Sequence, residues 1–281
     1  MTTAAGERII QCGGVDLCVE AFGDPADDAV LLIHGASASM LWWEEALCGR
    51  IAAGGRYVIR FDNRDTGRSS AWPPGRPGYG IGDMAGDAIG ILDALGVTRA
   101  HVVGRSMAGA IAPLVAARDP GRVASLTLVS TTPGDPGLSP MAEAVVRYTA
   151  GPGPDPTDPA AVVAFIVGLM RAYAGGSPHF DEAATRALAE RDVARTASIA
   201  SCLANHFLVA FDDAVAPGDA AVPTLVVHGD RDPVFGLDHG RALQRAIPGA
   251  DLLVLEDTGH DVPPPVWDRF VAALLAHTAA S

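Results

Sequence analysis

The feature that most constrains the fold is a serine between a buried strand and a helix. Residues 101–103 suit a short buried strand, and the apolar run 111–117 is typical of a helix. Ser106 lies between them in the sequence GRSMA. This pattern predicts a nucleophile elbow, a sharp turn that lifts the serine Oγ clear of the sheet and needs small residues two positions to either side. Ala108 replaces the second glycine of the motif, a mild departure because alanine fits most of the same space.

Strands and helices alternate along most of the chain. Apolar runs predict eight strands, at residues 8–12, 15–22, 29–33, 57–61, 101–103, 123–129, 224–227 and 251–255. Apolar periodicity predicts helices at residues 42–53, 83–95, 111–117, 160–173, 181–192, 195–211 and 266–277. The first two strands form an antiparallel hairpin, and the later alternation predicts an α/β fold with a mostly parallel sheet flanked by helices on both faces.

The residue composition of the chain changes after Thr132. Prolines break residues 133–216 into loops and short helices, and no strand pattern follows until Pro223. A chain of 281 residues is long enough for one large domain with an insertion. We therefore expect residues 1–132 and 217–281 to form one core, with 133–216 as an all-helical cap over the carboxyl edge of the sheet, where open α/β sheets bind ligands.

Charge excludes several classes of function. The net charge of −13 and the absence of a basic patch argue against nucleic acid as a partner, because phosphate binding needs clustered cations. All 20 cationic residues are arginines. Without a lysine, the chain has neither a Schiff-base amine nor the lysine of a P-loop. A small molecule is therefore the expected partner.

The cysteine spacing and the first ten residues predict a soluble protein whose thiols are reduced. Cys12, Cys18, Cys48 and Cys202 form neither a CxxC pair nor a short metal-ligand spacing, so we expect buried thiols, no metal and no cofactor. The first ten residues lack the pattern of a signal peptide, and no apolar run is long enough to span a membrane. We expect a cytoplasmic monomer or homodimer without membrane attachment.

A serine hydroxyl needs a general base, and the base needs an acid that fixes its tautomer. The order Ser, Asp, His is expected after an elbow of this kind. Asp232 follows the strand at 224–227, and His260 follows the strand at 251–255, so both lie at the same sheet edge as Ser106. Asp232 is the favoured acid because Pro233 stiffens the backbone after it. The other candidates for the acid are Asp230, Asp257 and Asp261.

Attack by a serine on a carbonyl creates an oxyanion, which backbone N–H groups stabilise. Met107 supplies one such amide because it directly follows the serine. The second is expected from the small residues after the strand at 29–33, most simply from Ala36. The sequence thus predicts an oxyanion hole made by the amides of Ala36 and Met107.

Several motifs together resemble the α/β-hydrolase superfamily across the whole core. They are LLIHGASAS, FDNRDTGRS, HVVGRSMAG, PTLVVHGDRDPV and DTGHDVP. The chain is most similar to the aclacinomycin methylesterase group, which cleaves a carbomethoxy ester on anthracycline polyketides. The resemblance implies an α/β-hydrolase fold, a Ser106–Asp232–His260 triad and the oxyanion donors named above. It implies an esterase that acts on an apolar, possibly aromatic polyketide-type methyl ester through an acyl-enzyme.

Arg105 departs from this pattern, because an apolar residue is expected before the nucleophile. It is a candidate contact for a carboxylate or an aromatic ring of the substrate, although an arginine that is at the surface or internally paired is the alternative. Met40, Trp42 and Phe207 are candidate lining residues of a pocket between core and cap, and His206 is a cap histidine within reach of a ligand.

Three other functions remain open. The same triad supports hydrolysis of a lactone or a C–C bond, and it supports a non-hydrolytic rearrangement of a polyketide. A catalytically silent ligand-binding protein of this fold is the third possibility. The complete Ser-Asp-His set argues against the silent protein.

Overall fold

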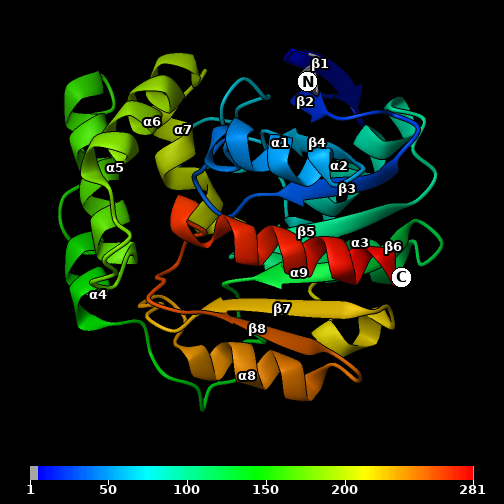
Figure 1. Ribbon diagram of the computed structural model, residues 1–281. Coiled ribbons are helices and arrows are strands. Elements are labelled where there is room, and N and C mark those ends of the chain that lie inside the picture. The colour runs from blue at the N-terminus through cyan, green and yellow to red at the C-terminus, as the bar shows by residue number, and fades with distance from the viewer. Residues whose placement is uncertain (1–5, 281) are drawn as a thin grey trace.

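The computed structural model describes residues 6–280 and is built around one eight-stranded sheet (Figure 1). The strand order is β1-β2-β4-β3-β5-β6-β7-β8. The bounds are β1 Arg8–Cys12, β2 Val15–Phe22, β3 Asp28–Ile33, β4 Arg56–Phe61, β5 Ala100–Arg105, β6 Val123–Val129, β7 Thr224–Gly229 and β8 Asp251–Leu255. β1 and β2 pair in antiparallel fashion, and β3 to β8 are parallel. The predicted fold class is confirmed.

Helices cover both faces of this sheet. Their bounds are α1 Glu45–Ala53, α2 Ile81–Ala94, α3 Ala108–Arg118, α4 Glu143–Thr149, α5 Pro159–Tyr173, α6 Glu182–Arg195, α7 Ile199–Ala204, α8 Leu237–Ala246 and α9 Trp267–Ala279. Leu31 and Ile33 of β3 pack in one apolar cluster with α2, α3 and α8. Val30 and Leu32 point the opposite way, toward α1 and α9. Strand alternation thus divides the core into two layers.

Four helices occupy the connection between β6 and β7. In Figure 1, α4 to α7 stand beside the sheet, and the arrow of β7 points toward them. α5 and α6 share a small apolar cluster of their own, which includes Val162, Val167 and Val193. The division into core and cap at residues 133 and 216 stays a prediction. Within residues 6–280, the structure has no helix that is both long and apolar enough to cross a membrane.

Several predicted helices differ from the structure at their ends. The helix expected at 42–53 begins at Glu45, after a separate 3-10 helix at Met40–Trp42. The single helix expected at 195–211 is divided: α6 ends at Arg195, α7 follows, and residues Asn205–Leu208 form a 3-10 helix. Ser198 causes the new start, because its Oγ accepts the N–H of Ser201. α2 begins at Ile81, since Asp83 is its third residue and accepts the Gly80 N–H.

Candidate active site

The Ser106 turn has the geometry of an elbow. β5 ends at Arg105, α3 begins at Ala108, and Ser106 has a φ of +53°, in the left-handed region that side chains rarely adopt. A Cβ on Gly104 would lie 2.4 Å from the carbonyl oxygen of Ala108. A Cβ on Gly109 would lie 2.0 Å from Thr131 Oγ1. The backbone thus approaches its neighbours closely at Gly104 and at Gly109, one residue after the motif position that Ala108 occupies.

His260 links the other two predicted triad residues. Its Nε2 is 3.0 Å from Ser106 Oγ, and its Nδ1 is 2.8 Å from Asp232 Oδ2. The N–H of His260 donates to the carbonyl oxygen of Tyr173, at the end of α5, at 2.9 Å. The ring of Tyr173 also meets the imidazole edge-on at 5.3 Å between centroids. The sequence offered no signal for this contact, because it depends on where α5 docks.

The other candidate acids have different partners. Asp230 accepts the N–H of Thr258 at 3.3 Å, and Asp257 pairs with Arg231 at the surface. Burial raises the pKa of Asp261, although Arg105 lies near enough to oppose that shift. Among these carboxylates, Asp232 is the one hydrogen-bonded to His260.

Asp232 is held as an anion by its surroundings. Burial acts to raise its pKa, but His260, the second largest influence, together with hydrogen bonds keeps the pKa below its ordinary value. Oδ1 accepts the N–H groups of Val234 and Phe235 at 2.8 and 3.0 Å. An ionised Asp232 favours a proton on Nδ1 of His260, which leaves the Nε2 lone pair facing Ser106.

Two amides near Ser106 have no protein acceptor. Among residues 6–280, neither the N–H of Ala36 nor that of Met107 donates to another group. Ser37 differs: its N–H donates to Nδ1 of His206 at 2.9 Å. A Cβ on Gly35 would lie 2.8 Å from the Cβ of Ser106, so the loop after β3 runs directly against the elbow. The two free amides can therefore serve an oxyanion.

Arg105 is buried and internally bonded. Its Nη1 is 3.0 Å from Nε2 of His34, and its Nη2 donates to the carbonyl oxygen of His260 at 2.7 Å. The Nε of Arg105 has no partner in the described structure. Burial lowers the pKa of this guanidinium. Arg105 thus ties the loop after β3 to the loop after β8, and its role as a substrate contact stays a prediction.

Of the three other predicted lining residues, Met40 and Trp42 share one 3-10 helix, Met40–Trp42, and Phe207 lies in the 3-10 helix Asn205–Leu208. Met40 is fully buried, and its N–H donates to Asp62 Oδ1 at 2.8 Å. Trp42 is half-buried and donates from Nε1 to Asp192 of α6 at 2.7 Å. Phe207 is 64% exposed at the surface. Their contact with a substrate also stays a prediction.

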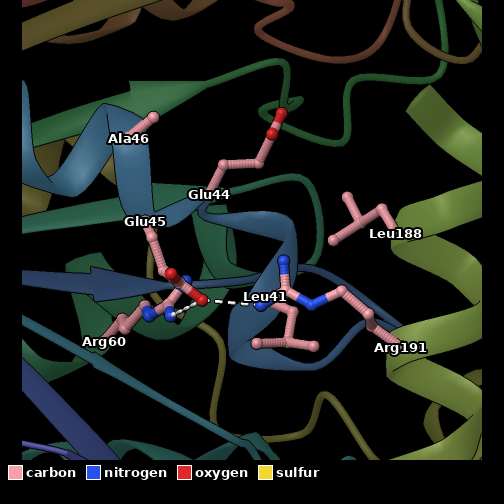
Figure 2. A pocket seen from close by; sticks show the side chains of 7 residues that line it. All are labelled: Leu41, Glu44, Glu45, Ala46, Arg60, Leu188 and Arg191. Carbon is pink, nitrogen blue, oxygen red and sulfur yellow. Dashed lines mark hydrogen bonds and ion pairs between the residues drawn. The ribbon is translucent and has the colours of Figure 1, made fainter.

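Two cavities lie where α6 meets the core. Figure 2 shows one of about 220 Å³, in which Glu45 of α1 faces Arg60, and Leu188 and Arg191 of α6 stand opposite. Its lining is Leu41, Glu44, Glu45, Ala46, Arg60, Leu188 and Arg191. A small cavity of about 20 Å³ touches Ser37, next to the free amide of Ala36. The rest of its lining comes from α5, α6, α7 and the residue that follows α6, and is mostly apolar: Val162, Ile166, Asp192, Val193, Thr196, Ile199, Cys202 and Leu203.

The four cysteines are free and buried, as the sequence predicts. Burial raises the pKa of the Cys18 and Cys48 thiols to about 12. Such thiols stay protonated at neutral pH and are poor nucleophiles and metal ligands. In the described range 6–280, no group of three His, Cys, Asp or Glu side chains has the arrangement of a metal site.

Comparisons with known proteins identify the family. Residues 28–263 match the family model of the α/β-hydrolase fold. The chain is 30% identical to the rhodomycin D methylesterase DnrP of Streptomyces peucetius, with 98% of both chains covered. The esterase RhEst1 from Rhodococcus superposes with a TM-score of 0.76 at 25% identity, covering 97% of this chain and 98% of that one.

A second solved structure shares the fold. The meta-cleavage product hydrolase CumD from Pseudomonas fluorescens superposes with a TM-score of 0.77 at 22% identity, covering 97% of each chain. The family match spans most of the chain, and the full-length relative is a methylesterase. The chain therefore belongs to the α/β-hydrolase fold family, and within it to the carboxylic-ester hydrolases.

Proposed function

We propose that this esterase cleaves a methyl ester of an apolar, ring-containing small molecule through an acyl-enzyme on Ser106. The observation that carries the proposal is the continuous hydrogen-bond chain from Ser106 through His260 to Asp232. Polyketide-type esters are the substrate class that the resemblance to a rhodomycin D methylesterase supports.

The chemistry follows from the atoms in this chain. Ser106 Oγ attacks the ester carbonyl carbon while His260 Nε2 takes the hydroxyl proton. Asp232 stabilises the imidazolium, and the amides of Ala36 and Met107 stabilise the oxyanion. His260 then protonates the leaving methoxide, so methanol departs and Ser106 carries the acyl group. Water, deprotonated by His260, cleaves that second ester and restores the free serine.

The small cavity beside Ser37 supports an apolar substrate. Most of the side chains that α5, α6 and α7 present to it are aliphatic. Because the cavity is only about 20 Å³, binding a ring-sized molecule requires the side chains of these helices to move apart. The acid or acyl part of the substrate then lies next to the free amide of Ala36.

A fluorophosphonate probe and a panel of esters test this function. We expect the probe to modify Ser106, identified by mass spectrometry of peptides, and to leave the Ser106→Ala variant unmodified. Aryl methyl esters, polyketide methyl esters and lactones are then compared by product mass and by methanol release. Failure of the probe to modify the folded protein would contradict the acyl-enzyme mechanism. Turnover of lactones without any turnover of methyl esters would contradict the proposed methyl ester substrate.

A further inference from the structure

His206 bridges two loops beside the candidate oxyanion hole. It lies in the 3-10 helix Asn205–Leu208, and it is 2% exposed. Its Nε2 is 2.7 Å from the carbonyl oxygen of Arg64, and its Nδ1 is 2.9 Å from the backbone N of Ser37. A carbonyl only accepts, so Nε2 carries the proton and Nδ1 offers its lone pair to the Ser37 amide.

Ser37 has a backbone conformation that needs support. Its φ is +54°, in the left-handed region, although it is not a glycine. The hydrogen bond from its N–H fixes the peptide group that joins it to Ala36. This peptide sets the orientation of the turn that carries the free N–H of Ala36. No other acceptor holds the Ser37 amide within residues 6–280.

The 3-10 helix is itself anchored to the core. Asn205 donates from Nδ2 to Asp65 Oδ2 at 2.9 Å and accepts the N–H of Gly75 at 2.7 Å. His206 therefore reaches Ser37 from a segment whose position is fixed by hydrogen bonds to the loop after β4. Its ring is enclosed and both of its nitrogens are bonded, which argues against direct contact with a substrate.

We propose that His206 is a positioning residue, whose Nδ1 holds the Ser37 amide so that the Ala36 N–H faces the developing oxyanion. This inference rests on the proposed serine mechanism, because it assigns a supporting part to the same oxyanion hole. An oxyanion donor is effective only when it is placed before the reaction, and small misplacements are costly. The bond to Ser37 thus contributes to turnover rather than to affinity for the ground-state ester.

Two substitutions separate the two bonds of the imidazole. His206→Asn places an amide oxygen near the position of Nδ1, so it retains an acceptor for Ser37. His206→Gln reaches toward the Arg64 carbonyl and leaves the Ser37 amide without that acceptor. We expect His206→Gln to lower kcat by about 10- to 100-fold with KM nearly unchanged, and His206→Asn to stay within about threefold of the natural enzyme.

A second readout excludes a merely structural role. Phenylboronic acid forms a tetrahedral anion on a serine, so its affinity should fall in parallel with kcat in the Gln variant. Equal kcat values in the two variants, or a loss confined to KM or to melting temperature, would overturn the inference. If the Gln variant does not fold, the ¹⁵N spectrum of the histidines in the natural protein decides. A proton on Nδ1 of His206 contradicts the bond, and a proton on Nε2 supports it.

The proposed function can fail separately. Full activity of Ser106→Ala would remove the serine mechanism and, with it, the reason for this inference. Loss of activity in Ser106→Ala together with unchanged kcat in His206→Gln would reject the role of His206 alone.

Discussion

The candidate active site and the seam between α6 and the core are both built from residues far apart in the sequence, but by different means. Ser106, Asp232 and His260 each follow one of the parallel strands of the sheet, so strand pairing brings them to the same edge. At the seam, contacts depend on how helices outside the sheet dock. The first arrangement follows from topology, and the second follows from shape and charge at one particular surface.

The seam is unusually polar for a contact between helices and a core. Arg195 of α6 donates to both carboxylate oxygens of Asp62, at 3.0 and 2.8 Å, and Asp62 is fully buried. Trp42 and Asp192 form a second link. Buried charges are costly to desolvate, so such pairs add little net stability. Their main effect is to specify how α6 is positioned on the core.

The largest expected effect belongs to the serine. Ser106→Ala should lower turnover by at least about 10⁴-fold, because it removes the nucleophile while the oxyanion hole remains. The melting temperature should stay close to that of the natural protein. Measurement of kcat on a methyl ester checks this, and retention of most activity would refute the triad.

Asp232→Asn tests whether the acid follows from sheet topology. The amide permits the wrong tautomer of His260, so kcat should fall by about 10³- to 10⁴-fold. Asp230→Asn is the matched control two residues earlier, and it should change kcat little because, within residues 6–280, the Asp230 carboxylate bonds the backbone N–H of Thr258 and not His260. If Asp230→Asn lowers kcat strongly and Asp232→Asn does not, Asp230 is the acid.

Arg195→Met tests the seam without touching the triad. The substitution leaves the Asp62 carboxylate buried without its cation, so unfolding free energy should fall by about 3–5 kcal/mol. Arg191→Met is the control on the same helix. Arg191 pairs with Glu45, both side chains are more than half exposed, and its loss should cost less than about 1 kcal/mol. Urea denaturation measures both, and equal losses would contradict the contrast between buried and exposed pairs.

A pH titration provides the smallest expected effect, far from both regions. His101 in β5 is buried, and burial lowers its pKa to about 4 from an ordinary value of 6.5. Between these two pH values, the unfolded chain takes up a proton that the folded chain refuses, so stability falls as pH falls. One such group contributes up to about 1.4 kcal/mol per pH unit.

His101→Gln should reduce this pH dependence of unfolding free energy between pH 6.5 and 4.5. Burial also lowers the pKa of His34, His206, His228 and His277, so the dependence should weaken rather than vanish. Chemical denaturation at several pH values measures the slope. An unchanged slope in the variant would show that folding does not lower the pKa of His101.

Much of the fold follows from local pattern. Continuous apolar runs are recognisable because parallel strands are buried on both faces, and the predicted limits at 8–12, 15–22, 123–129 and 251–255 agree with the structure. Helices outside the sheet were harder to place. α4 and α7 are short, and so carry little periodicity: α4 was not predicted, and α7 was merged with its neighbour. α8 was also not predicted, although its ten residues are amphipathic.

The sequence by itself determined which residues come to the sheet edge, because the Gly-Ser turn, the strand ends and the order Ser, Asp, His are local signals. The tertiary structure decided the rest of the neighbourhood. It placed Arg105 against His34 and His260, His206 on the amide of Ser37, and Tyr173 against the imidazole. No spacing rule encodes such contacts, since they depend on the docking of one packed surface on another, where a displacement of about an ångström removes a hydrogen bond.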